Sequence, residues 1–168
     1  MMKSLIVYSS KTGNTAMVAK AILEVMPDST ACFPVETAPE PDEFDCVIVG
    51  FWVNKGTADA GAKHYMAKIR NKQVALFGTL GAYPDSEHGR SSMLNAKALL
   101  DDSNTILGDF MCQGKIDPKL LAAFRQFPAD HPHAVTPERL TRHKVASTHP
   151  DADDLIKAKQ VFQQIIPA

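Results

Sequence analysis

The residues best suited to chemistry lie together near the start of the chain, where hydroxyls, a lysine and a glycine follow one another: Ser9-Ser10-Lys11-Thr12-Gly13-Asn14-Thr15. An apolar run at 5–8 precedes this stretch, and a helical pattern follows it. The first N–H groups of a helix lack intrahelical partners and carry partial positive charge. Ser and Thr hydroxyls can donate further hydrogen bonds from the sides. The stretch is therefore predicted to bind a phosphate group.

The common nucleotide motifs are missing from this stretch. Neither Gly-x4-Gly-Lys-Ser/Thr nor Gly-x-Gly-x-x-Gly follows the first apolar run. A simpler interpretation is that Ser10, Thr12 and Asn14 only cap the helix. Two later aromatic segments favour ligand binding over capping alone.

These two segments each follow an apolar run and each carry one large aromatic. Phe51-Trp52-Val53-Asn54-Lys55-Gly56-Thr57 holds the single Trp of the chain, and Thr79-Leu80-Gly81-Ala82-Tyr83-Pro84-Asp85-Ser86 holds a Tyr. Ligands of open parallel sheets bind outside the carboxyl ends of the strands, so both segments are expected beside the phosphate-binding stretch. Either aromatic alone could be a packing residue. Together they predict stacking on a flat ring that is joined to the phosphate.

Predicted strands and helices alternate along the chain. The apolar patterns predict strands at 3–8, 30–33, 46–51, 73–78 and 105–112, and helices at 14–26, 58–69, 87–100, 118–127 and 151–165. The most apolar strand, 46–51, is predicted at the centre of the sheet. Alternation implies right-handed crossovers and helices on both faces of a parallel sheet. We expect one three-layer, doubly wound α/β domain over residues 1–168 with a five-stranded parallel sheet.

Composition excludes several function classes. The formal net charge of −1 gives no bulk attraction to nucleic acid or anionic lipid. The first apolar run is too short for a signal segment or a membrane span, so we expect a cytoplasmic protein. The three cysteines are widely spaced in apolar runs and are predicted to be buried structural thiols. The segment 129–149 holds four of the six histidines and is predicted to be an irregular solvated loop rather than a metal site.

The phosphate-binding stretch, from Ser10 to Thr15 behind an apolar strand, resembles the phosphate loop of the flavodoxins. The Trp52 and Tyr83 segments fall where flavodoxins hold the isoalloxazine ring of FMN. The resemblance covers the chain to about Cys112 and again the final helix. It implies FMN as cofactor and a sheet order of 2-1-3-4-5. The expected cofactor-binding residues are Ser9, Ser10, Lys11, Thr12, Gly13, Asn14, Thr15, Phe51, Trp52, Val53, Asn54, Lys55, Gly56, Thr79, Leu80, Gly81, Tyr83 and Asp85.

The sequence departs from the flavodoxin pattern in charge. Electron-carrier flavodoxins are similar to one another in their strongly acidic surfaces, whereas this chain has a pI near 6.6. Lys55 follows the Trp, and we hypothesise that its charge stabilises an anionic reduced flavin. An unchanged second reduction step in Lys55→Gln would contradict this. Main-chain groups of the turn 54–56 could also contact the flavin N5, although Gly56 could be a turn residue only.

The sequence leaves three possible functions. The first is an FMN-dependent electron carrier that moves electrons between a reductase or ferredoxin and a terminal enzyme, with no catalytic residues of its own. The second is an NAD(P)H-dependent FMN or quinone oxidoreductase, in which 129–149 closes over the flavin. The third is a flavin-free phosphoryl-accepting receiver, which needs an acidic Mg²⁺ cluster that the strand ends lack.

Two charged segments could contact a partner protein. The segment 34–45 holds five acidic residues and no Lys or Arg, and is either a solvated face or a docking surface. Arg139, Arg142 and Lys144 are either simply exposed or form a docking face for an acidic partner. The sequence does not predict an oligomeric state.

Overall fold

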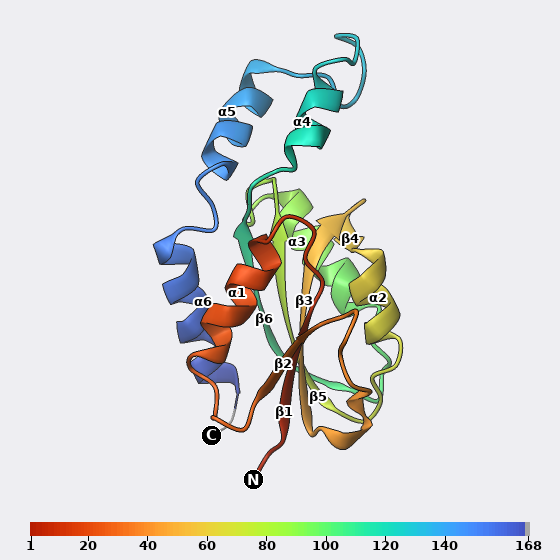
Figure 1. The fold of residues 1–168 in the computed structure, drawn as a ribbon. Helices are drawn as coiled ribbons and strands as arrows, with labels where there is room; N and C mark the ends of the chain where they lie inside the picture. The colour runs from red at the N-terminus through yellow and green to blue at the C-terminus, as the bar shows by residue number, and fades with distance from the viewer. Residues whose placement is uncertain (167–168) are drawn as a thin grey trace.

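The computed structural model describes residues 1–166 and is built on a mostly parallel sheet (Figure 1). The parallel strands are β1 (Ser4–Tyr8), β2 (Ala31–Pro34), β3 (Cys46–Asn54), β5 (Gln73–Leu80) and β6 (Thr105–Gln113). Their order, β2-β1-β3-β5-β6, confirms the predicted 2-1-3-4-5 arrangement. A two-residue strand that was not predicted, β4 (Thr57–Ala58), pairs antiparallel with the end of β3.

Helices cover both faces of the sheet, which confirms the three-layer α/β prediction (Figure 1). One face carries α1 (Asn14–Leu23) and α6 (Ala152–Ile165), and the other carries α2 (Ala60–Met66) and α3 (Glu87–Lys97). Val18 and Ile22 of α1 join Phe162 of α6 in one apolar cluster. Met66 of α2 and Met93 of α3 belong to the cluster on the opposite face.

Strand β3 lies at the centre of the sheet, as its apolar sequence predicts. It pairs in parallel with β1 on one side and with β5 on the other. Val47, Ile48, Val49 and Phe51 are all fully buried. A strand covered by helices on both faces needs apolar residues at consecutive positions rather than at alternate ones.

Two helices project beyond the carboxyl ends of the strands: α4 (Pro118–Phe124) and α5 (Pro137–Ala146) (Figure 1). We call residues 115–149 the arm. The prediction of an irregular segment at 129–149 is wrong for α5. Its start has ordinary helix signals, because Thr136 Oγ1 accepts a hydrogen bond from the Arg139 N–H at 3.2 Å and Pro137 occupies the first turn. The segment was predicted to be irregular, whereas its Pro137 begins a helix.

The structure also corrects the bounds of several elements. Trp52, Val53 and Asn54 were predicted in a loop and lie in β3, and Thr79 and Leu80 lie in β5. The first four predicted helices are shorter in the structure, and a 3₁₀ turn, η1 (Pro41–Glu43), interrupts the acidic segment. Both aromatic segments therefore begin as paired strand ends, since Trp52 pairs with Thr79 and Leu80 pairs with Gln113. Only residues 81–86 form a loop.

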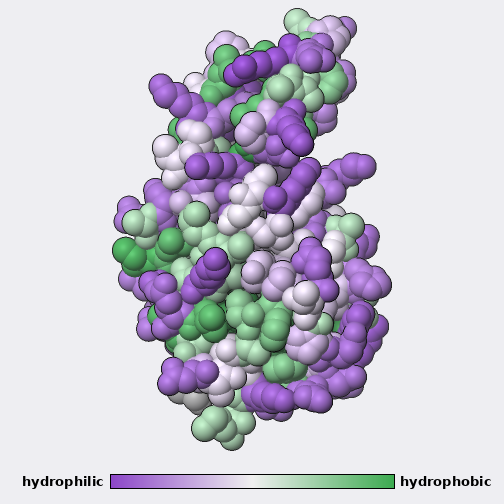
Figure 2. All heavy atoms as spheres, in the orientation of Figure 1, coloured by the Kyte–Doolittle hydropathy of each residue, from purple (hydrophilic) through white to green (hydrophobic). Residues whose placement is uncertain are grey.

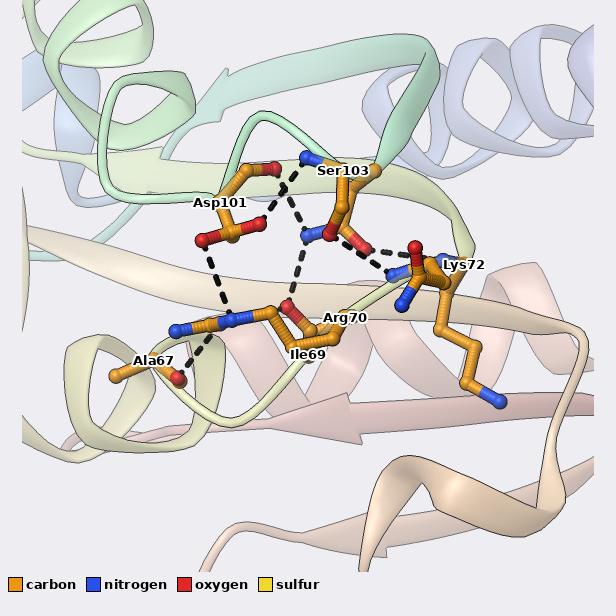
Figure 3. Close-up of polar contacts among 8 residues, drawn as sticks. Ala67, Ile69, Arg70, Lys72, Asp101 and Ser103 are labelled. Atoms are coloured by element: carbon orange, nitrogen blue, oxygen red, sulfur yellow. Dashed lines mark hydrogen bonds and ion pairs between the residues drawn. The ribbon is translucent and has the colours of Figure 1, made fainter.

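At the amino-terminal ends of the strands, polar contacts join the loops before β5 and β6 (Figure 3). Arg70 Nε lies 3.2 Å from Asp101 Oδ2, and the Asn71 N–H donates to Ser103 Oγ at 3.0 Å. Hydrogen bonds from Ser103 lower the pKa of Asp101, and the Arg70 charge lowers it further. A hollow of about 520 Å³ beside these loops is lined by residues such as Met2 and Thr105. It lies at the amino-terminal ends of the strands, away from the predicted cofactor edge.

Candidate functional site

The phosphate loop, residues 9–15, joins β1 to α1. Gly13 is the N-cap of α1 and has φ 93°, a left-handed conformation that favours glycine. A β-carbon at this position would meet no atom within 4 Å, so the conformation and not the space selects glycine. Within residues 1–166, no acceptor contacts the main-chain N–H groups of residues 12–15. These open donors lie at a helix N-terminus, where an anion is stabilised.

The hydroxyls of the phosphate loop divide into two groups. Ser9 and Thr15 are buried, and the Thr15 hydroxyl lies 3.0 Å from that of Thr79 in β5. Ser10 Oγ accepts a hydrogen bond from the Ala16 N–H at 3.2 Å, and Thr12 Oγ1 accepts one from Asn14 Nδ2 at 3.1 Å. Ser10 therefore caps the helix in part. The hydroxyls of Ser10 and Thr12, which we call the outer hydroxyls, only accept in these contacts, so each keeps its proton to donate to an anion. Ser9 and Thr15 instead fix the loop to the interior.

Asp59, which the sequence analysis missed, connects three parts of the site. It is 2% exposed, and its Oδ2 accepts a hydrogen bond from Ser9 Oγ at 2.5 Å. Its Oδ1 accepts from the Trp52 N–H at 3.2 Å, and the side chain also caps α2 through the N–H groups of Gly61 and Ala62. An Asp before a helical pattern is a recognisable cap signal. Its contact with Ser9, 50 residues away, has no local signal in the sequence.

Trp52 lies on a hairpin beside the phosphate loop. Strand β3 turns back into β4 through Lys55 and Gly56, whose φ values are 51° and 75°. Two positive φ angles in a two-residue turn are typical of a type I′ hairpin. Trp52 is half-buried, and Lys11 Nζ lies 5.6 Å from the centre of its ring. The hairpin therefore places the indole beside Lys11 of the phosphate loop.

The hairpin tip is exposed and is anchored to α3. Asn54 and Lys55 are exposed, and Asn95 Nδ2 donates to the Gly56 carbonyl at 2.8 Å. This carbonyl is therefore engaged within the protein, as expected for a turn residue. The contact of this turn with the flavin N5 and the effect of Lys55 stay predictions.

The loop 81–86 after β5 carries Tyr83, which is 41% exposed. Its carbonyl accepts a hydrogen bond from the Ser86 N–H at 3.1 Å, and Gln113 Nε2 holds the Gly81 carbonyl at 3.0 Å. Asp85 is exposed, and its carbonyl accepts from Arg90. Three other predicted binding residues lie in the interior, each at most 6% exposed: Phe51, Thr79 and Leu80.

The base of the arm completes the cofactor edge. Asn14 Nδ2 donates to the Lys115 carbonyl at 2.8 Å, and Lys11 Nζ lies 3.8 Å from Asp117 Oδ2. The Lys115 N–H donates to the His149 carbonyl at 3.0 Å, so the arm leaves and rejoins the body beside the phosphate loop. The sequence contains no signal for these long-range contacts.

The residues present fit FMN. The open N–H groups at Gly13 and the outer hydroxyls of Ser10 and Thr12 are the donors that a phosphate ester needs. The half-buried indole of Trp52 and the exposed phenol of Tyr83 lie on elements that leave the same edge of the sheet. Aromatic faces of this kind can contact a flat ring.

Other groups have structural explanations. Within residues 1–166, His149, Asp151 and Asp154 bring donor atoms within 4.8 Å of one another. The two carboxylates already form the capping box of α6. The three cysteines are free thiols, and burial is the main cause that raises the pKa of Cys46 to about 11 and raises the pKa of Cys32 and Cys112. Cys46 and Cys112 are buried, as predicted, and Cys32 is half-buried.

A family model described as a flavodoxin domain matches residues 5–163. The chain belongs to the flavodoxin family. As a flavodoxin, it is an FMN-binding flavoprotein, and the family acts as electron carriers. The match also includes the arm, whereas the resemblance in the sequence ended near Cys112 and resumed at the last helix. The family assignment decides against the flavin-free receiver.

Relatives and solved structures agree with the assignment. A flavodoxin-like domain-containing protein BilS of Clostridioides difficile (strain CD3) is 34% identical, with 98% of this chain and 97% of that protein aligned. A BilS protein of Clostridium symbiosum (strain WAL-14163) is 29% identical over 99% of this chain and 97% of its own length. A Streptococcus pneumoniae TIGR4 flavodoxin superposes with a TM-score of 0.58 at 12% identity, covering 96% of this chain and 95% of that one. This last likeness concerns the fold alone. Among residues 1–166, no helix combines the length and apolar character needed to cross a bilayer.

Proposed function

We propose that this flavodoxin shuttles electrons to a redox partner enzyme, with FMN held at the carboxyl edge of its sheet by the residues predicted from the sequence. The observation that supports this most is the set of open main-chain N–H groups before α1. Hydrogen bonds to a charged group contribute about 1.5–3 kcal/mol each, so the phosphate should supply more of the affinity than ring stacking. The single-domain organisation and the cytoplasmic location stay predictions.

The residues take different roles in this proposal. The N–H groups of residues 12–15 and the hydroxyls of Ser10 and Thr12 bind the phosphate. Trp52 and Tyr83 contact the ring. When bound, the flavin supplies the redox chemistry, and the protein binds it, orients it and tunes its environment. We assign no side chain of this chain a catalytic role.

Thr12→Ala tests the phosphate loop. Thr12 is exposed and contacts only Asn14 by a side-chain hydrogen bond, so its loss should leave the fold intact. We expect the Kd for FMN, measured by flavin fluorescence quenching, to rise about tenfold, because one charge-assisted hydrogen bond is lost. The matched control is Ser91→Ala, an exposed hydroxyl on α3, which should change the Kd less than twofold. Equal values for both variants would contradict the assignment of the loop.

The alternative function is an NAD(P)H-dependent FMN or quinone oxidoreductase. The observation that favours it is the arm, which begins and ends beside the phosphate loop and could enclose a substrate. Anaerobic mixing of the FMN-loaded protein with NADH or NADPH separates the two functions. Rapid bleaching of the flavin would favour the enzyme. Bleaching only after a separate reductase is added would favour the carrier.

A further inference from the structure

The arm carries a charge opposite to that of the rest of the molecule. Between residues 115 and 149 there are six Lys or Arg and three Asp or Glu. The whole chain has 18 and 19, so the remainder holds twelve basic and sixteen acidic residues. The arm thus has a net charge of +3 on a body of −4. An uneven distribution of this kind orients a charged partner during its approach.

The Lys and Arg side chains of the arm differ from those of the body in their ion pairs. Six basic side chains of the body form ion pairs with acidic ones, among them Lys68 with Glu40 and Lys97 with Asp109. Within residues 1–166, none of the six Lys or Arg side chains of the arm forms an ion pair. Arg139 donates to the Ala134 carbonyl at 2.6 Å, and the Nε atom of Arg142 is buried. The exposed charges without an ion pair in residues 1–166 are those of Lys115, Lys119, Arg125 and Lys144. These charges are free to meet carboxylates of another molecule.

Apolar side chains lie among these charges. Leu120 is 47% exposed and Leu140 is 49% exposed, and Phe127 and Val145 are each 37% exposed. No residue of α4 is buried, and α5 buries only Ala146. Figure 2 shows apolar residues interleaved with hydrophilic ones over the projecting part of the molecule. Large apolar side chains exposed together on one projecting surface are typical of interaction sites.

We propose that the arm is the surface on which this flavodoxin docks a redox partner protein whose own contact surface is acidic. The proposal rests on the proposed carrier function. Lys11, which pairs with Asp117 of the arm, also lies near Trp52, so the arm adjoins the cofactor edge. A partner held there would lie close to the flavin. Here the carrier would contribute the basic surface and the partner the acidic one, which reverses the charges expected for a carrier with an acidic surface.

A titration followed by NMR tests the docking surface without requiring electron transfer. The probe is an oxidised bacterial ferredoxin with an acidic surface, added to the ¹⁵N-labelled, FMN-loaded protein at low salt. We expect shifts of backbone amides within 115–149 that disappear at high salt, because exposed charges are screened. Shifts confined to surfaces outside the arm, or no shifts at all, would overturn the proposal.

Two charge-reversal variants make the test specific. K119E/R125E/K144E changes three exposed residues of the arm, and K20E/K63E/K157E makes the same change of charge on α1, α2 and α6. All six side chains lack ion-pair partners within residues 1–166. The arm variant should bind the ferredoxin at least about tenfold more weakly than the body variant. Equal weakening of both would indicate a net-charge effect and overturn the proposal.

A second copy of this chain is the competing occupant, since its acidic segment 34–45 could contact the arm. Sedimentation of the protein alone distinguishes the two. A dimer that dissociates in K119E/R125E/K144E would overturn the assignment to a partner protein. A failure of the proposed function has a different signature. If the arm amides shift but a reduced ferredoxin never delivers its electron to the flavin, the docking surface stands and the carrier function does not.

Discussion

The body and the arm of this flavodoxin are stabilised in different ways. In the body, helices such as α1 bury Val18 and Ile22 completely against a sheet whose central strand is buried on both faces. In the arm, α4 buries nothing, and Phe124 stacks on His133 and His143 with ring centres 5.9 and 6.0 Å apart. Apolar burial is the main source of stability, so the arm should open at a lower free-energy cost than the body.

Asp59→Ala should have the largest effect, because Asp59 joins the phosphate loop, the Trp52 hairpin and α2 in the interior of the body. Its loss leaves buried donors without an acceptor. We expect the free energy of unfolding to fall by about 3 kcal/mol and the FMN affinity to fall with it. Urea unfolding and FMN fluorescence titration measure the two.

The matched control is Thr136→Ala, which removes a helix cap in the arm. Thr136 makes one capping hydrogen bond, to the Arg139 N–H. This change should cost about 1 kcal/mol and leave the FMN affinity within about twofold. Equal costs and equal losses of affinity in the two variants would contradict the distinction between body and arm.

Phe124→Ala should loosen the arm and spare the body. It removes the ring that stacks on His133 and His143. We expect the free energy of opening of α5, measured by hydrogen exchange, to fall by about 1–2 kcal/mol. The control is Leu140→Ala, an exposed residue of α5, which should lower the same free energy of opening by less than about 0.5 kcal/mol. Equal protection losses in β3 and α5 would show that the two regions unfold together.

The two regions should also respond to acid at different pH values. Burial, and then the charges of Arg142 and Arg139, lower the pKa of His143 below its ordinary 6.5. The unfolded arm therefore binds this proton more tightly than the folded arm. The stability that neutral His143 contributes is fully present above pH 6.5 and is lost as the pH falls through the lowered pKa.

In the body, Asp101 is a group whose pKa is shifted, and it titrates at a lower pH than His143. The pKa of Asp101 is lowered from 3.8, so the stability that it contributes is lost only as the pH falls below that value. Hydrogen exchange between pH 7 and pH 5 should show a small loss of protection in α5 and none in β3. His143→Gln should remove this dependence. A persistent loss in that variant would assign it to another group.

The elements of the body were predictable because their signals are local. Six consecutive apolar residues from Cys46 to Phe51 indicate a buried strand, and the hydroxyl-rich turn with Gly13 indicates a helix start able to bind an anion. The helix α5 was missed because 129–149 was predicted as one irregular segment, although Thr136-Pro137-Glu138 within it is a regular helix start. The hairpin after Trp52 was missed because its turn is formed by Lys55 and Gly56 and not by Asn-Gly or Asp-Gly.

The amino-acid sequence alone was enough to predict the alternation of strands and helices, the order of the sheet through its likeness to the flavodoxins, and the position of the phosphate loop. The folded structure was needed to show that Ser9 and Trp52 share the carboxylate of Asp59, and that the arm begins and ends beside Asn14. The reason is physical. Periodicity and capping act over a few residues, whereas a contact between residues 14 and 115 depends on where the folded sheet brings two distant segments of the chain together.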